Sequence, residues 1–206
     1  MTRAHPALAL AALSAAGWLC LAGPAAAQQP AGPHPGAAPQ QEVVFSPWTK
    51  MCAPPAQAQG KLICMTVKEA RFDTGQFVAG VALIEEAGVA KKLVRITIPL
   101  GMQIQFGTRM IIDNGQAMTS PYATCVQNGC MADYEVDETF IAQMKKGQQV
   151  LLQGINTTGH ASSYAIPLAD FAKAQEGEGS DPKAFEAQQK KFWEEKLKAR
   201  AVQGQK

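Results

Sequence analysis

The sequence of 206 residues contains few charged and few aromatic side chains. Asp, Glu, Lys and Arg make up 17% of it and Phe, Trp and Tyr 7%, and 19 basic against 17 acidic residues leave a formal charge of +2. Because non-specific nucleic-acid binding requires a marked basic excess, we expect neither DNA nor RNA as a partner. The 47% of hydrophobic residues still suffices for one domain of ordinary size.

Histidine is scarce, and the common enzyme motifs are missing. Once an N-terminal leader is removed, only His34 and His160 remain as candidates for a general base. The sequence has no Gly-x-Ser-x-Gly elbow, phosphate-binding loop, dinucleotide glycine pattern or calcium loop. We therefore expect a non-enzymatic protein without catalytic residues, cofactor or metal. The alternative is an unrecognised hydrolase, which would need an acid and a hydroxyl beside His160 in a concave site.

An apolar run of membrane-spanning length is also missing, and the N-terminal run has another explanation. Residues 7–22 are apolar, follow Arg3 and His5, and lead to a small-residue site at 25–27. This pattern predicts a secretory signal peptide over residues 1–27, removed after Ala27, because the run is short for a membrane anchor. We expect Sec-type export to the periplasm or beyond the cell, with outer-membrane association left open, and no transmembrane span after cleavage.

Cysteine is infrequent, and its count changes with processing. Loss of Cys20 with the leader reduces five cysteines to an even four: Cys52, Cys64, Cys125 and Cys130. In an oxidising compartment four cysteines predict two disulfides, for which three pairings exist. We favour Cys52–Cys64 and Cys125–Cys130, because the turn-rich segment 53–60 and the Asn128-Gly129 turn let the chain double back. The spacing fits neither a zinc site nor a C-x-x-C redox motif.

The segment 42–174 has the pattern of an all-β domain. Short runs rich in Val, Ile, Leu and Phe are bounded by Gly, Pro or charged turns. The expected strands are 62–67, 77–84, 92–98, 102–106, 109–112, 131–136, 150–155 and 163–166. Asn114-Gly115 predicts a hairpin and hence antiparallel pairing. The sequence therefore predicts an antiparallel sandwich or barrel with one or two short helices.

The first of these helices is expected after Asp137, which can cap it, and Gly147 should end it. A shorter helical turn is expected over 168–174. The segment 28–41 is rich in Pro, Gln and Ala and is interpreted as a linker that cannot order itself.

The last segment, 175–206, is charged and differs from the domain before it. Ser180 or Asp181 before Pro182 can start a helix that reaches about residue 201. Its apolar residues, which are candidates for docking a partner, are Phe185, Phe192, Trp193 and Leu197. This stripe is narrow, so the segment is expected either as a solvated, helical or disordered tail or as a partner-docking helix. If the segment docks a partner, deletion of residues 175–206 should abolish complex formation and leave the stability of the β domain unchanged.

An ordered set of short motifs then points to a family. The set comprises Trp48-x-x-x-Cys52, Cys64 after a turn-rich loop, Arg95, Pro99-Leu100-Gly101, the 107–113 stretch, Pro121 to Cys125, Asn128-Gly129-Cys130, Lys146-Gly147 and Ile166 to Phe171. Over residues 45–172 it resembles the invasion-associated locus B family of exported alpha-proteobacterial envelope proteins. The resemblance gives structural roles to Trp48, Pro99, Gly101, Asn128, Gly129, Pro167 and Phe171. Asp170 replaces a glycine usual in the family, and the tail after residue 175 extends past the family's usual end.

The resemblance also implies a function. Family membership implies a small secreted β-rich domain, linked in some pathogens with invasion of host erythrocytes, and no known catalytic site. We therefore expect a cell-envelope or secreted protein that binds an unknown protein in the envelope or on a host surface. A periplasmic accessory or scaffold protein that docks through its C-terminal helix is the alternative.

Overall fold

The computed structural model of the chain describes residues 41–54 and 61–203, which all belong to one compact unit. The predicted signal peptide, all but the last residue of the predicted linker, and residues 55–60 of the Cys52–Cys64 loop lie outside these ranges. Within them, no helix combines the length and apolar composition needed to cross a bilayer.

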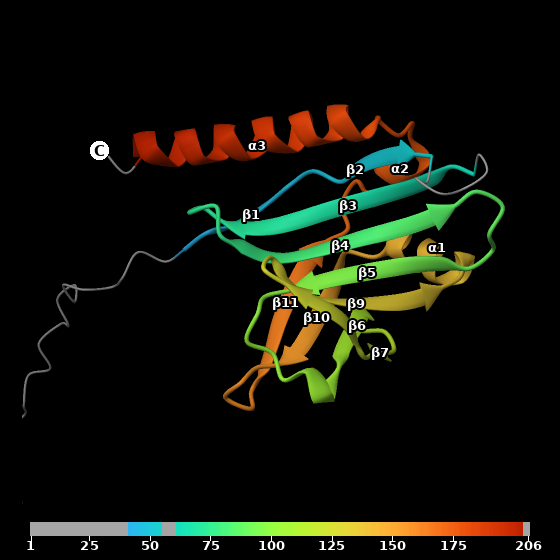
Figure 1. Cartoon of the computed structure of the whole chain (residues 1–206), viewed down its shortest axis with the longest axis horizontal. Coiled ribbons are helices and arrows are strands. Elements are labelled where there is room, and N and C mark those ends of the chain that lie inside the picture. The colour runs from blue at the N-terminus through green and yellow to red at the C-terminus, as the bar shows by residue number, and fades with distance from the viewer. Residues whose placement is uncertain (1–40, 55–60, 204–206) are drawn as a thin grey trace, which may run out of the picture. The chain divides into compact units, whose positions relative to one another are not determined.

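The larger of two antiparallel sheets has seven strands (Figure 1). They are β1 (Val43–Phe45), β2 (Thr49–Ala53), β3 (Ile63–Phe72), β4 (Phe77–Glu86), β5 (Lys92–Ile98), β8 (Tyr122–Val126) and β9 (Gly129–Val136). The spatial order is β1-β3-β4-β5-β9-β8, and β2 also pairs with β3. Since β1 pairs with residues 70–72 of β3 and β2 with residues 63–67, the two short strands form one interrupted edge.

The smaller sheet has four strands in the order β11-β10-β6-β7. They are β6 (Thr108–Ile112), β7 (Met118–Ser120), β10 (Gln149–Ile155) and β11 (Ala161–Pro167). The predicted hairpin at Asn114-Gly115 is confirmed, because β6 pairs antiparallel with β7. The left-handed residue of this turn is Asp113, with φ 50°, and its carboxylate accepts hydrogen bonds from the N–H groups of Gln148 and Gln149.

The core consists of side chains from both sheets. In β5, Val94, Ile96 and Ile98 are fully buried while the residues between them are partly exposed, as the sequence alternation predicts. Met110, Leu152 and Ile166 of the smaller sheet belong to the same buried cluster. The expected all-β antiparallel fold of sandwich type is therefore confirmed.

The strand predicted over residues 102–106 is wrong. Met102 forms only an isolated bridge with Asn156, and residues Ile104–Phe106 form a 3-10 helix, η1. Gly101 and Gly107 flank the segment with φ of 89° and 64°, so the backbone turns away from the sheet at both ends. The apolar residues Ile104 and Phe106, whose alternation is typical of a strand, are therefore exposed on a loop.

Three α-helices complete the fold. In α1 (Glu138–Lys146) the Asp137 carboxylate accepts a hydrogen bond from the Phe140 N–H at 2.9 Å, and Gly147 ends the helix, as predicted. Helix α2 (Phe171–Glu176) occupies the expected helical turn. Helix α3 (Pro182–Gln203) begins where Asp181 accepts hydrogen bonds from two backbone N–H groups, and it lies beside the interrupted β1/β2 edge (Figure 1).

Candidate functional site

His160 does not form a hydrolase-like site. It lies in the exposed turn between β10 and β11. Its ring Nδ1 is 3.1 Å from the Thr158 hydroxyl, and its backbone N–H donates to Asn156 Oδ1. No described carboxylate contacts it, and none of the cavities described below includes it. The arrangement has one hydroxyl, but among the described residues no acid contacts His160, as the predicted hydrolase alternative would require.

The carboxylates near the end of β9 are engaged in ion pairs or a helix cap. Both oxygens of Asp133 accept hydrogen bonds from Arg95 at 2.7 Å, and this contact raises the pKa of the arginine. Glu135 pairs with Lys91 at 2.7 Å, and the hydrogen bond lowers the pKa of the Glu135 carboxyl. Asp137 caps α1. Within the described ranges, no group of three or more His, Cys, Asp or Glu side chains could hold a metal ion.

A groove lies between the β6–β7 turn, the end of β9 and α1. Its volume is about 880 Å³. Met118, Val136 and Phe140 contribute apolar surface, and Lys146 and the Lys91–Glu135 pair contribute charge at the exposed rim. Concave sites that combine apolar surface with a few polar groups are the usual binding sites of proteins. We call this feature the α1 groove and regard it as the candidate binding site.

Sequence reasoning predicted both the hairpin and the helix that line the α1 groove, but not their proximity. The turn lies near residue 114 and the helix begins at Glu138, and no local pattern relates the two. They become neighbours because the chain crosses from β7 of the smaller sheet to β8 and β9 of the larger sheet, and β10 then returns to pair with β6.

The two disulfides pair as predicted. Cys52–Cys64 joins β2 to β3, and Cys125–Cys130 closes the hairpin between β8 and β9. Gly129 has φ 138°, and a Cβ atom at this position would lie 2.5 Å from the Ile98 carbonyl oxygen. The glycine is therefore required both by the turn and by the close approach of β5.

The other motif residues named by the sequence resemblance fall into two places. Pro99 and Gly101 follow β5 in the loop that leads to η1, and Asn128 lies exposed in the β8–β9 turn. Trp48, Pro167 and Phe171 come together in the core. The Trp48 Nε1–H donates to the Pro167 carbonyl at 3.0 Å, and the Trp48 and Phe171 rings meet edge to face at 4.9 Å.

A buried lysine accompanies this aromatic cluster. Lys68 lies 5.6 Å from the centre of the Trp48 ring. Burial lowers the pKa of Lys68, while the negative charge of Asp170 acts in the opposite direction. Asp170 has φ 66°, a conformation that favours glycine but that aspartate tolerates. The aspartate in place of glycine was noticed in the sequence, but its electrostatic influence on Lys68 was not predicted.

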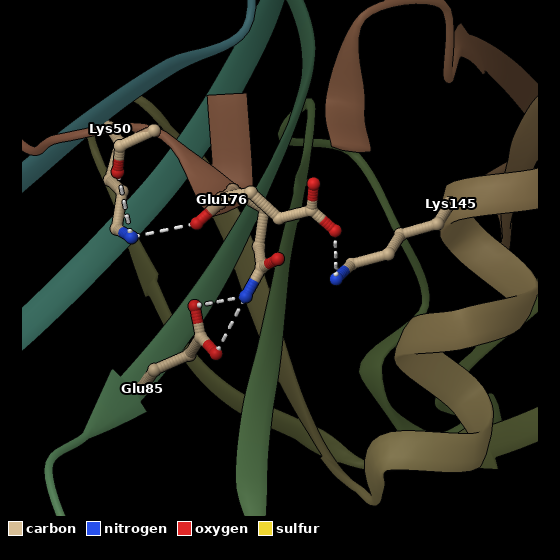
Figure 2. A network of polar contacts seen from close by, with 6 residues as sticks. Lys50, Glu85, Lys145 and Glu176 are labelled. Atoms are coloured by element: carbon tan, nitrogen blue, oxygen red, sulfur yellow. Dashed lines mark hydrogen bonds and ion pairs between the residues drawn. The ribbon is translucent and has the colours of Figure 1, made fainter. Parts of the chain in front are cut away.

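A polar network fastens the end of α2 to three other elements (Figure 2). Lys50 Nζ donates to the carbonyls of Gln175 and Gly177 at 2.7 and 3.1 Å. The Gln175 amide donates to both oxygens of Glu85. Lys145 and Glu176 form an ion pair at 2.8 Å, and its hydrogen bond lowers the pKa of the Glu176 carboxyl. The segment that was expected to begin a separate tail is therefore attached to β2, β4 and α1.

The C-terminal helix packs on its own domain and is not the solvated tail that was one of the two expectations, while docking of a partner through this helix stays a prediction. Trp193 is only 9% exposed and lies under the Arg71 guanidinium at 5.0 Å. Phe185 and Phe192 are half-buried, while Leu197 is exposed but contacts Gly75. Arg200 pairs with Asp73 at 3.0 Å. The apolar stripe is narrow, and the contacts of Arg71 and Arg200 contribute to the packing of the helix. A hydrophobicity pattern does not show polar contacts of this kind.

The segment before α3 also closes the sheet edge. The Cys52 N–H donates to the Ser180 carbonyl at 2.9 Å, and the Ser180 N–H donates to the Lys50 carbonyl at 3.0 Å. A Cβ atom on Gly179 would lie 2.3 Å from Cys52 Sγ, so the chain passes directly over the disulfide. The edge of β2 is therefore paired at this point by the protein's own chain.

These features define a class of protein: a small disulfide-bonded domain of two antiparallel sheets, with a helix along one sheet edge and a groove beside α1. The family profile described as Invasion associated locus B (IalB) protein matches residues 48–179. The chain therefore belongs to the IalB family, as the motif order predicted.

Individual proteins agree with this assignment. The Invasion protein B homologs of Brucella abortus (strain 2308) and of Brucella abortus biovar 1 (strain 9-941) are each 27% identical over 135 residues, covering 66% of this chain and 73% of theirs. The crystal structure of invasion associated protein B from Bartonella henselae superposes with a TM-score of 0.54 at 18% identity, over 72% of this chain and 98% of that one. The latter similarity supports the fold.

Proposed function

We propose that this chain is an exported, non-enzymatic protein of the cell envelope that acts by binding another protein. Membership of the IalB family is the observation that carries the proposal, because the relatives are named as invasion proteins. Two disulfides support maturation in an oxidising compartment. The invasion role of the relatives enters here as part of the proposal, with the partner in the envelope or on a host surface.

The α1 groove is the proposed contact surface. Its open form and mixture of apolar and charged side chains suit a segment of a protein better than a small reactive molecule. The side chains that reach it, such as Thr139, Gln143 and Lys146, carry no activated nucleophile and no histidine.

Site-specific photo-crosslinking tests this proposal in living cells. A benzoylphenylalanine probe at exposed Gln143 in the groove should give one discrete adduct in the exporting cell or with host membranes. The same probe at exposed Ser163 on β11 is the matched control and should give none. Equal adduct patterns at the two positions, or no adduct at Gln143, would contradict binding through the groove.

Export is tested separately. Fractionation of the native cell, followed by mass analysis of the non-reduced protein, should recover a chain that lacks residues 1–27 and contains both disulfides outside the cytoplasm. An intact chain with free thiols in the cytoplasm would refute the proposed location.

One observation favours a second function, that of an accessory protein docked through α3. The family match ends at residue 179, so α3 is an addition to the region that the family profile matches. The same photo-probe at exposed Gln188, on the outer side of α3, tests it. An adduct at Gln188 together with none at Gln143 would replace the groove by the helix as the contact surface.

A further inference from the structure

Three long stretches of the sequence contain no Asp, Glu, Lys or Arg. They are residues 96–108, 114–132 and 147–169. Each includes strands that contribute to the core, where an absence of charge is ordinary. The stretches also include loops, however, where charged residues are normally frequent.

One loop of each stretch lies at the same end of the molecule, whereas the β6–β7 turn of the second stretch belongs to the α1 groove. The Gln103 N–H donates to the Ile155 carbonyl at 2.7 Å, and the Thr157 N–H donates to the Gly101 carbonyl at 2.9 Å, so the loop after β5 is bound to the β10–β11 turn. Figure 1 shows these two segments side by side at the lower edge of the fold. The β8–β9 turn approaches the end of β5 at Gly129. We call residues 99–107, 126–129 and 156–160 together the uncharged tip.

The uncharged tip exposes several large apolar side chains. Leu100, Ile104 and Phe106 are 53%, 61% and 62% exposed, and Val126 of the neighbouring turn is 45% exposed. The backbone beneath them is fixed by the hydrogen bonds to the β10–β11 turn, and the Gln103 amide adds a bond to the Asn156 carbonyl at 2.8 Å. These side chains are therefore held in water by a defined backbone. Exposed apolar clusters of this kind mark surfaces that bind proteins or membranes.

We propose that the uncharged tip docks the domain onto the surface of a lipid bilayer, with Ile104 and Phe106 inserted at the boundary between headgroups and acyl chains. The tip contributes no residues to the α1 groove or to the 190 Å³ and 220 Å³ cavities of the described chain. It also presents no charges for pairing with a protein. A projecting apolar loop without charge can enter the interface at little desolvation cost.

The polar groups around the tip fit the same location. Gln105, Gln127, Asn128 and Thr157 are neutral and exposed, and their amides and hydroxyl can hydrogen-bond within the headgroup layer. Exposed Arg109, which follows the first stretch on β6, is long enough to remain among the headgroups. This role goes beyond the proposed function: it concerns where the domain is held and leaves the partner of the groove open.

Vesicle binding of the exported, processed and oxidised protein tests the proposal. Sedimentation with phosphatidylcholine vesicles should show binding that is nearly independent of ionic strength, because no charge on the tip drives it. Ile104→Ser and Phe106→Ser should each lower the partition coefficient about tenfold, the effect of removing one buried apolar side chain. Val202→Ser is the matched control, since Val202 is 63% exposed on α3, and it should change nothing.

A spectroscopic variant locates the insertion. Phe106→Trp should show a blue-shifted emission on addition of vesicles and quenching by brominated lipids, whereas Val202→Trp should show neither. Circular dichroism of each variant should match the parent, because the replaced side chains are exposed.

Three results would overturn the proposal. The first is no binding to phosphatidylcholine vesicles. The second is binding only to vesicles that contain phosphatidylglycerol, reversed by salt and unchanged in Phe106→Ser, because the lysines of α3 would then be responsible. The third is a concentration-dependent dimer in sedimentation velocity that Phe106→Ser abolishes, which would assign the tip to a second copy of the chain.

Discussion

The two-sheet core and the interface beneath α3 each contain a buried tryptophan. The two regions differ in whether the indole N–H group of that tryptophan has a hydrogen-bond partner. Phe171 in the core is fully buried, and its neighbour Trp48 donates its indole N–H to Pro167. Trp193 in the α3 interface is 9% exposed, and its indole nitrogen is buried without a hydrogen-bond partner among the described residues. Burial alone therefore does not make two contacts equivalent.

The contrast is weaker for other polar atoms, because the hydroxyl oxygens of Thr66 and Tyr122 in the larger sheet are also buried without a partner among the described residues. In the core, the Tyr134 hydroxyl lies 2.6 Å from the Thr108 hydroxyl, and burial raises the pKa of Tyr134 to about 12. Beneath α3, one side-chain oxygen each of Asp73 and Gln189 has no partner in the described part of the chain, and a cavity of about 190 Å³ remains. We infer that α3 opens at a lower free energy than the sheets.

The largest expected effect lies in the core. Phe171→Ala removes a fully buried ring that packs edge to face on Trp48, so it should lower the free energy of unfolding by about 3–5 kcal/mol. Urea unfolding at neutral pH measures this. A loss below about 1 kcal/mol would show that the core closes around the missing ring without leaving a cavity. The core would then contribute no more to stability than the α3 interface.

The Cys52–Cys64 disulfide is expected to rank second. It spans 12 residues of sequence, so the double substitution C52A/C64A should lower stability by about 3 kcal/mol, against about 2 kcal/mol for C125A/C130A with its span of 5. The larger loop loses more chain entropy on closure. Equal losses for the two pairs would indicate that strain or residual structure, rather than loop length, sets their contributions.

The α3 interface should contribute less. Trp193→Ala should lower stability by about 1–2 kcal/mol, below the range for a fully packed core aromatic, because the indole is imperfectly enclosed. Glu195→Ala on the exposed side of the helix is the control and should change little. Native-state hydrogen exchange should show the amides of α3 opening before those of β4 and β5. Simultaneous exchange of all three would contradict an independent opening of the helix.

The smallest expected effect is a pH dependence of the Lys145–Glu176 pair. The hydrogen bond from Lys145 lowers the pKa of Glu176 from its usual 4.5 in the folded state. The pair's contribution is therefore present above pH 4.5 and is lost as the pH falls through the lower, folded-state pKa. Glu176→Gln should remove that part of the acid dependence seen in unfolding curves, and Glu178→Gln is the neighbouring control. Identical acid profiles for parent and Glu176→Gln would contradict the prediction.

Much of the fold could be predicted because its signals are local. Alternation predicted β5, the Asp137 cap predicted α1, and short spacing predicted both disulfides. The 102–106 segment shows the limit of this reasoning. Its alternation is typical of a strand, but the segment lies in a loop between Gly101 and Gly107, and alternation alone does not distinguish the two. The candidate site was less predictable, since the α1 groove joins a hairpin and a helix that are separate in the sequence.

The sequence alone determined the strands β3 to β6 and β9 to β11, the antiparallel class, the cysteine pairing and the family, because each depends on nearby residues or on an ordered set of motifs. The tertiary structure decided the division of strands between two sheets, the α1 groove, the uncharged tip and the packing of α3 on its own domain. These features arise from contacts between residues far apart in the chain, such as Arg200 with Asp73 and Lys50 with Gln175. Such contacts require a folded chain to bring the two partners together, and no local pattern records them.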